Sequence, residues 1–274
     1  MRSLDWFDAL QHGQVALLAF GLVVLLIAET LLPGGAALPW RARLTHVGRN
    51  AMLWVISTIL VSVVLGGLLI GVALWLEVHR VGILYSWPVP AWLLFVAGFL
   101  ALDFGDYVYH RLSHQTRWLW LLHSVHHSDP HLDVSTNLRA HPAHVVLSSL
   151  TKPIVLAAIG IPLWVWMLRE LLSLPVTQLQ HASLHLPPRV ERALRHVILT
   201  PGLHRIHHSP NPTQTNSNFG GVLPLWDKLF GTFRDDAPRR DAVRYGLDAL
   251  RGERWQTIAG MLRTPVSARR IDTL

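Results

Sequence analysis

Ala51 to Leu76 reads AMLWVISTILVSVVLGGLLIGVALWL, a run of 26 residues without a charged side chain. An α-helix rises about 1.5 Å per residue, so a helix of this length crosses the roughly 30 Å hydrocarbon core of a bilayer with some tilt. A second apolar run, Val15 to Leu32, is interrupted only by Glu29 and Thr30 near its end. The two runs predict membrane-spanning helices and therefore an integral membrane protein.

The composition agrees with a membrane protein and excludes several other classes. Of the 274 residues, 51% are hydrophobic and only 15% are charged, whereas a typical soluble domain is roughly 25% charged. Intrinsic disorder requires low hydrophobicity and high net charge, so it is excluded for most of the chain. The sequence contains no cysteine, which excludes disulfides, thiolate metal sites, iron–sulfur clusters and cysteine nucleophiles.

A third span is predicted between Gly82 and Leu102. Pro90 favours a helix that starts near it, because proline is tolerated in the first turn of a helix. If this helix continues to His114 it has 25 residues and a length of about 37 Å at 1.5 Å per residue. Its far end would therefore leave the lipid.

The region from Val145 to Val176 is apolar but broken. Gly160 and Pro162 interrupt its 32 residues, and such breaks favour a tight membrane hairpin of two short helices over one span. A hairpin would return the chain to the side of the membrane from which it came.

The arginines indicate how the spans are oriented. Arg41, Arg43 and Arg49 lie between the first two spans, Arg80 alone lies between the second and third, and nine arginines lie in residues 234–270. Because cytoplasmic loops are enriched in Lys and Arg, the first loop and the C-terminal tail are expected on the cytoplasmic side. The net charge of +7 is explained by these arginines, and no nucleic-acid partner is expected.

Ten of the 17 histidines follow a pattern that occurs twice. DYVYHRLSH (106–114) places two histidines at i and i+4, and LLHSVHHSDP (121–130) places three at i, i+3 and i+4. QHASLHLP (180–187) and LHRIHHSPN (203–211) repeat this order after the hairpin. Residues at these spacings share one face of a helix, so their imidazoles can reach one metal. The ten residues are His110, His114, His123, His126, His127, His181, His185, His204, His207 and His208.

These histidines predict a centre with two metal ions. Neutral imidazole is a good ligand for Fe, Zn, Cu or Ni, and ten imidazoles exceed the needs of one four-coordinate ion. Asp106, one turn before His110, is expected either to accept the second N–H of that imidazole or to be a solvated carboxylate. The other histidines are interpreted as surface or core residues, with the last two intermediate: His12, His46, His79, His131, His196, His141 and His144.

The motifs that are absent narrow the chemistry. The sequence has no HExxH and no Glu between Glu77 and Glu170, so a zinc peptidase would lack its general base in the first cluster. Gly-rich dinucleotide and phosphate loops are also missing, so a redox reaction needs electrons from a separate partner. Three alternatives stay open: a zinc-bound protein of hydrolytic or structural type, a metal transporter, which needs ionisable residues along its spans, and an inactive scaffold.

The histidine motifs HRLSH, HSVHH, HASLH and HRIHH, together with NLRAHP and NFGGVLPLWDKLFGTF, resemble the fatty acid hydroxylase and sterol desaturase superfamily. The resemblance runs from about Leu102 to Phe233. It implies an all-α integral membrane protein of about four to five membrane helices, including the short hairpin, with a cytosolic helical cap that holds a histidine-rich dimetal centre. It also implies two iron ions (with zinc possible as purified), dioxygen as co-substrate, and an electron-transfer protein of cytochrome b5 or ferredoxin type. The implied reaction is hydroxylation or desaturation of a C–H bond in a lipid, such as a fatty acyl chain or a sterol, that enters from the bilayer.

The resemblance also implies roles for individual residues. The ten histidines would be the metal ligands. The candidates to hold these ligands in place without touching the metals are Asp106, His141 and Asn218. His144 takes the place of an acidic residue that commonly follows NLRAHP in the family, so Arg139 and His141 are expected to pack or to support ligands. The trailing motif is interpreted first as structure of the cap, through Asn216, Asn218, Trp226, Asp227, Gly231 and Thr232.

Four tryptophans border the third span and the hairpin, where a lipid would enter. We interpret Trp118, Trp120, Trp164 and Trp166 chiefly as an aromatic belt at the membrane interface.

The organisation predicted from these observations is a single integrated domain. A cleaved signal peptide is disfavoured, since Asp5 and Asp8 weaken the positive region that such a peptide needs. The expected segments are the N-terminal spans (1–102), the first histidine cluster (103–144), the membrane hairpin (145–176), the second histidine cluster with the trailing motif (177–233) and a basic cytosolic tail (234–274).

Overall fold

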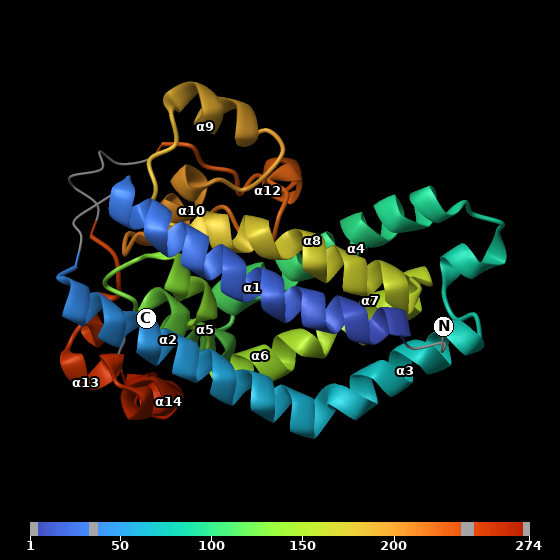
Figure 1. Cartoon of the computed structure of the whole chain (residues 1–274), viewed down its shortest axis with the longest axis horizontal. Helices are drawn as coiled ribbons and strands as arrows, with labels where there is room; N and C mark the ends of the chain where they lie inside the picture. Colours follow the sequence, from blue (N-terminus) through green and yellow to red (C-terminus); the bar gives the residue numbers. More distant parts are fainter. Residues whose placement is uncertain (1–4, 33–37, 237–243, 271–274) are drawn as a thin grey trace.

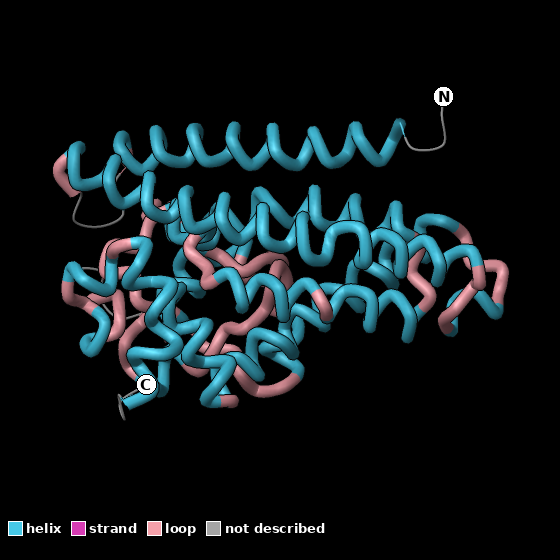
Figure 2. Tube along the Cα trace, turned by 90° about the horizontal axis from the view of Figure 1, so that it is seen from below, coloured by secondary structure: helices cyan, strands magenta, loops and turns pink. Residues whose placement is uncertain are grey.

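The computed structural model describes residues 5–32, 38–236 and 244–270. Parts of the predicted tail, residues 237–243 and 271–274, lie outside the described residues. The described chain folds into helices and loops (Figures 1 and 2), so the predicted all-α fold is confirmed. The membrane part is formed by α1 (Asp5–Leu31), α2 (Trp40–Val61), the π-helical turn η1 (Ser62–Gly66), α3 (Gly67–Val78), η2 (Ile83–Ser86), α4 (Ala91–Gln115), α6 (Pro142–Ser149), α7 (Thr151–Ile159) and α8 (Leu163–His181).

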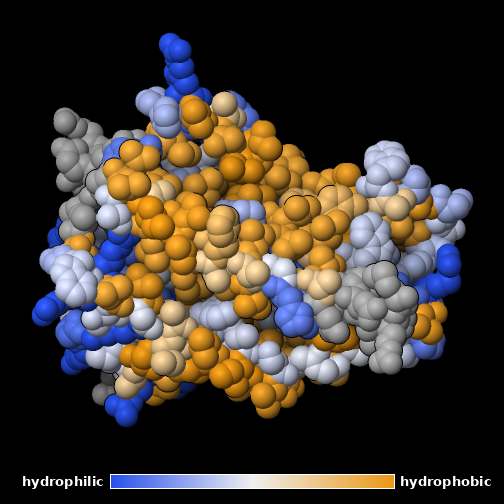
Figure 3. All heavy atoms as spheres, in the orientation of Figure 1, coloured by the Kyte–Doolittle hydropathy of each residue, from blue (hydrophilic) through white to orange (hydrophobic). Residues whose placement is uncertain are grey.

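Among the described residues, four helical stretches are long and apolar enough to cross a membrane: Ala9–Leu31, Trp40–Ser86, Ala91–Gln115 and Pro142–Ile159. Many of their large apolar side chains face outward, for example Phe20 at 67% exposure and Val63 at 80%. Figure 3 shows this surface as an orange area over the middle of the molecule. Exposed apolar area of this extent is expected where lipid takes the place of water.

α4 has the length predicted from the sequence, beginning directly after Pro90 and ending at Gln115. Gly98 lets it approach the hairpin closely, since a Cβ atom there would lie 2.5 Å from Val165 Cγ1 and 3.0 Å from Ile161 Cγ2. The helix thus joins the apolar core to the histidine-bearing end of the molecule.

The prediction that Arg41, Arg43 and Arg49 lie in a loop is wrong, because α2 begins at Trp40 and contains all three. Pro39, with φ −52°, precedes the first turn and sets its geometry. Arg43 Nη2 then lies 2.6 Å from Glu29 Oε2 on α1. The ion pair holds the adjoining ends of the two helices together.

The hairpin turns at Gly160, which ends α7 with φ +82°. This left-handed conformation favours glycine, and Gly82 lies so close that a Cβ atom on it would be 2.1 Å from Gly160 N. α8 follows with 19 residues, longer than the short helix predicted, and carries His181 at its end. Figure 2 shows α1 as the outermost long helix of the bundle.

The remaining elements lie toward one end of the membrane helices, and Figure 1 shows α5, α10, α13 and α14 in the left half of the molecule. They are α5 (Arg117–His127), η3 (Val134–Leu138), α9 (Pro188–Leu194), α10 (Pro201–His207), α11 (Pro212–Thr215), α12 (Leu225–Leu229), η5 (Asp248–Leu250), α13 (Glu253–Gln256), α14 (Ile258–Ser267) and η6 (Ala268–Arg270). These short helices carry or support most of the histidines.

Candidate metal centre

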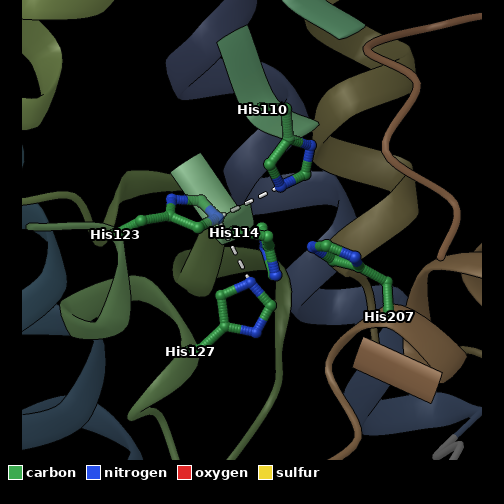
Figure 4. A group of neighbouring side chains, drawn as sticks. All are labelled: His110, His114, His123, His127 and His207. Atoms are coloured by element: carbon green, nitrogen blue, oxygen red, sulfur yellow. Dashed lines mark hydrogen bonds between the residues drawn. The ribbon is translucent and has the colours of Figure 1, made fainter. Parts of the chain in front are cut away.

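Nine of the ten predicted histidines form two groups whose ring nitrogens face one another. Within each group the ligand atoms lie within 4.8 Å of one another, and Figure 4 shows the five rings of the first group converging. Group 1 is His110, His114, His123, His127 and His207; group 2 is His126, His181, His204 and His208.

Each histidine triplet is divided between the two groups. On α5, His123 and His127 belong to group 1, whereas His126 belongs to group 2. At α10, His204 and the following His208 belong to group 2, whereas His207 belongs to group 1. The i and i+4 members of each triplet therefore stay together, and the i+3 member crosses to the other group.

Backbone carbonyls fix the orientation of four of these rings. His110 Nδ1 lies 2.9 Å from the Phe219 carbonyl and His207 Nδ1 lies 2.8 Å from that of Ser217, both in group 1. In group 2, His126 Nδ1 faces the Arg139 carbonyl at 3.0 Å, and His181 Nδ1 faces the Thr177 carbonyl at 2.7 Å. When Nδ1–H donates to a carbonyl, Nε2 keeps its lone pair, which is the usual arrangement of a metal-bound imidazole.

The environment favours the neutral form of the rings. Burial, reinforced by neighbouring imidazoles, holds the pKa values of His123, His126, His127, His204, His207 and His208 well below the usual value of 6.5. Burial also lowers the pKa of His181 to about 4, although its hydrogen bond to Thr177 opposes the shift. The rings are thus in the form that binds metals.

The unpartnered nitrogens fit metal ions. Both ring nitrogens of His114 and Nε2 of His207 are buried without a hydrogen-bond partner among the described residues, and a buried polar atom in that state is unfavourable. His204 Nε2 lies 3.0 Å from His181 Nε2 and 3.1 Å from His208 Nε2. Nitrogens bound to one ion at about 2.1 Å are at most about 4.2 Å apart, so little movement would be needed. An all-imidazole donor set suits Fe, Zn, Cu or Ni.

His185 belongs to neither group. The prediction placed it beside His181 on one helical face, but α8 ends at His181, and Ala182 is extended with φ −60° and ψ 132°. The i, i+4 argument therefore does not apply beyond His181. His185 Nδ1 is buried and has no hydrogen-bond partner within the part of the chain that the structure describes.

The residues that were predicted to hold the ligands in place differ in their contacts with the histidines. Asp106 is not hydrogen-bonded to His110; its side chain is 27% exposed and pairs with Lys152 and with Arg169, whose Nη2 lies 2.6 Å from Asp106 Oδ2. His141 caps α6 by accepting from Ala143 N and is in neither histidine group. Arg139, in contrast, is buried and supplies the carbonyl that holds His126.

The trailing motif is the loop that supplies the carbonyls for group 1. Asn218, in the left-handed region with φ +55°, lies between Ser217 and Phe219. Its Nδ2 donates to the Leu203 and Arg234 carbonyls. Asp227 accepts from the Phe219 and Gly220 N–H groups, both at 2.8 Å. The motif thus acts as structure of the site, as interpreted from the sequence.

Two tryptophans have positions that the aromatic-belt interpretation did not anticipate. Trp120 is buried, with its ring centroid 4.8 Å from that of His114. Trp166 lines a cavity between the membrane helices. Trp118, at 57% exposure, agrees with a belt position. The ring of His144 lies 4.7 Å from that of His123.

Sequence reasoning missed a buried polar network on the other side of α5. His46 Nε2 lies 2.9 Å from both carboxylate oxygens of Asp129, and Asn50 Nδ2 donates to Ser135. Burial alone would raise the pKa of Asp129, but His46 and Arg139 lower it well below its usual range. The only signal in the sequence is a set of polar residues within or beside apolar runs.

Glu29 was also missed, although it interrupts the first apolar run. It is 4% exposed and accepts from the backbone N–H groups of Val134 at 2.8 Å and Ser183 at 2.7 Å. An ionisable residue inside a membrane span is a functional candidate by default, so its position was a usable signal.

A cavity of about 620 Å³ lies among the membrane helices and extends toward the metal centre, although no histidine is among its lining residues. Leu69 and Leu163 line its apolar part, and Asp106, Thr177 and Gly221 line it near the histidines. Thr177 also supplies the carbonyl that faces His181. The volume lies within the 300–1,000 Å³ that is usual for small-molecule sites.

Comparison with known proteins gives consistent relatives. The family model of fatty acid hydroxylases matches residues 95–232. The chain is 36% identical over 160 residues to the alkylglycerol monooxygenase of Danio rerio, covering 57% of this chain and 33% of that protein. It is 32% identical over 162 residues to the ornithine lipid hydroxylase OlsE of Rhizobium tropici, covering 59% of this chain and 47% of that protein. It is 29% identical over 164 residues to the methylsterol monooxygenase 2-2 of Arabidopsis thaliana, covering 56% and 59%.

The chain therefore matches about a third of the length of the alkylglycerol monooxygenase and about half of the ornithine lipid hydroxylase. No solved structure matches the chain.

Proposed function

Because the chain belongs to the fatty acid hydroxylase family, we propose that it is a membrane-bound di-iron oxygenase that hydroxylates a C–H bond of a lipid. The overall reaction consumes one dioxygen, two electrons and two protons for each hydroxyl group introduced and releases one water. The named relatives are hydroxylases and monooxygenases that act on lipids, which favours hydroxylation over desaturation.

The observation that carries this proposal is the pair of buried histidine groups beside a cavity that opens among membrane helices. Iron bound by these groups would supply the activation of dioxygen. Group 1 would hold one ion with five imidazoles and group 2 the other with four.

The chain's own residues contribute positioning and exclusion of water. The carbonyls of Phe219, Ser217, Arg139 and Thr177 keep four rings directed at the ions. Trp120 and Phe219 pack against His114 at centroid distances of 4.8 and 5.1 Å and cover that side of the centre. A lipid in the cavity would reach the histidines without leaving the membrane.

The zinc alternative of hydrolytic type receives no support. Among the described residues both groups consist of imidazoles alone, and Asp106 is engaged by two cations. Neither group thus contains a carboxylate positioned to act as a general base.

We further propose that the metal centre faces the cytoplasm and receives electrons from a separate carrier of cytochrome b5 or ferredoxin type. The arginines at the start of α2 and in residues 244–270 support this orientation through the positive-inside rule. The sequence contains no flavin or nicotinamide fingerprint, which supports an external source of electrons.

The first test is the metal content of protein purified anaerobically in detergent and loaded with ferrous iron. We expect about two irons per chain and incorporation of ¹⁸O from labelled dioxygen into a lipid product when reductant is supplied. His126→Ala should lose the metal of group 2, because it removes one of only four imidazoles.

His12→Ala is the matched control, since His12 is exposed and belongs to neither group. It should keep the wild-type metal content and turnover. Equal metal content in all three proteins, or zinc alone after iron is offered under reducing conditions, would contradict the assignment.

A further inference from the structure

The cavity contains an ion cluster that the proposed reaction does not use. Asp106, Lys152, Arg169 and Glu170 line the cavity together, and Asp106 lies one turn before His110 on α4. Ionisable groups in a membrane span are costly and usually mark a site for a polar ligand. The cluster therefore requires an explanation of its own.

The two cations of the cluster are already neutralised by acids. Lys152 Nζ lies 2.5 Å from Asp106 Oδ1 and 3.5 Å from Glu170 Oε1. Arg169 Nη2 lies 2.6 Å from Asp106 Oδ2, and Arg169 Nη1 lies 3.1 Å from Glu170 Oε1. Each cation thus already lies beside two carboxylates, although Arg169 Nε has no hydrogen-bond partner among the described residues.

Asp103 adds a third carboxylate behind the cluster. Its Oδ1 lies 3.3 Å from Arg169 Nη2, and the residue is fully buried. Three carboxylates thus face two cations, which leaves one negative charge in excess.

Glu170 presents this excess charge to the cavity. Its side chain is 35% exposed, against 4% for Arg169 and 12% for Lys152. Among the described residues Glu170 Oε2 accepts no hydrogen bond, whereas Oε1 lies near both cations. Ser148, Ser149 and Ser173 line the same region and add hydroxyl groups.

We infer that the cavity binds the head of a lipid that donates hydrogen bonds and carries no negative charge, such as a polyol, and that it excludes carboxylate and phosphate heads. This rests on the proposed function in that the bound lipid is the substrate. A hydroxyl group can donate to Glu170 Oε2, whereas an anion there would meet a like charge at low dielectric. The apolar part of the cavity, at Leu69 and Leu163, would take the chain.

The test measures binding, without turnover, of two probes with the same chain to protein in an uncharged detergent. The probes are 1-O-hexadecylglycerol and hexadecyl phosphate, at pH 7.5. We expect the glycerol ether to bind at least about tenfold more tightly, which corresponds to about 1.4 kcal/mol.

Glu170→Gln keeps the shape of the side chain and removes the excess charge. It should reduce the preference severalfold, toward equal binding of both probes. Glu253→Gln is the matched control, because Glu253 is 73% exposed in α13 and outside the cavity, and it should leave the preference unchanged.

Lys152→Met distinguishes this inference from the alternative that the cluster binds an anionic head. Removing a cation from an acidic site should weaken the binding of hexadecyl phosphate still further. The preference for the glycerol ether should remain. Tighter binding of hexadecyl phosphate by the wild type, lost in Lys152→Met, would overturn the inference and assign the cluster to an anionic head.

The outcome is independent of the iron measurement. If the preference holds but no lipid is oxidised, the proposed function fails and the head selectivity stands. If iron and turnover are found but both probes bind equally in wild type and Glu170→Gln, the selectivity fails and the proposed function stands.

Discussion

His126 and His207 tie the two groups of histidines to each other. His126 lies on the same helix as two ligands of group 1 but contributes to group 2, and His207 does the reverse. His127 and His208 stack across the boundary between the groups with a centroid distance of 4.6 Å. A change in one group is therefore transmitted directly to the other.

The position of His185 leads to a prediction about the ligand set. We expect His185→Ala to keep both metals, because His185 belongs to neither group, whereas His181→Ala should lose the metal of group 2. Metal stoichiometry of the two variants checks this. Loss of one metal in His185→Ala would show that the segment after α8 moves to bring an additional ligand.

Asp227 holds the loop that orients His110, so its replacement should affect group 1 alone. Asp227→Asn replaces one carboxylate oxygen with an NH₂ group that cannot accept from the Phe219 or Gly220 N–H. We expect the affinity of one of the two sites for metal to fall about 10- to 100-fold, as is typical when a group that orients a metal ligand is altered. A chelator titration measures this, and Asp235→Asn, at an exposed position, is the control. Equal weakening of both sites would contradict the specific role of the loop.

At the scale of elements, α1 connects the two halves of the centre although it lies outside the region that matches the family, residues 95–232. Glu29 on α1 accepts from Val134 N–H in η3, which follows the first histidines, and from Ser183 N–H, which follows His181. One carboxylate thus fixes the segments next to both histidine clusters.

Glu29→Gln should therefore destabilise the protein. Both N–H groups donate to Oε1, which the amide keeps, but the amide loses the negative charge that strengthens these bonds and replaces Oε2, the oxygen that faces Arg43. Hydrogen bonds to charged groups contribute about 1.5–3 kcal/mol each. Thermal unfolding in detergent should show a lower Tm than for wild type. Glu253→Gln, on the exposed surface, should keep the wild-type Tm, and an unchanged Tm in Glu29→Gln would argue against this function of α1.

The elements differ in how well the sequence predicted them, for physical reasons. α4 was predicted closely because Pro90 marks its start and an unbroken pattern follows. The predicted histidine set includes all nine members of the two groups and, in addition, His185. The end of α8 at His181 depends on tertiary contacts, which cannot be read from the spacing of the histidines. The division of the triplets was not predictable either, because i+3 and i+4 both lie near one face and differ by only about 100° around the axis. The partners of Glu29 and Asp106 are far away in sequence and could not be assigned.

At the scale of the whole molecule, the buried imidazoles make the metal-free protein sensitive to acid. In the unfolded chain these histidines have pKa values of about 6.5, whereas in the folded protein burial lowers them, to about 4 for His181. Between these values the unfolded state binds more protons, so the free energy of unfolding falls as pH falls. We expect the Tm of chelator-treated protein to drop between pH 7 and pH 5, and bound metal to be released over the same range because protons compete for the ligands. A Tm that is constant or rises toward pH 5 would contradict this.

The division of each histidine triplet between the two groups also determines when the ligand sets become complete during biosynthesis. When the ribosome has completed the hairpin up to Gly160, four of the five ligands of group 1 exist but only one of the four ligands of group 2. Group 1 is completed only by His207 and group 2 only by His208, after α8 has returned the chain to the side on which α4 ends. Both complete ligand sets therefore exist only after the chain has been made up to His208, and a nascent chain arrested in the hairpin would carry an incomplete chelating site.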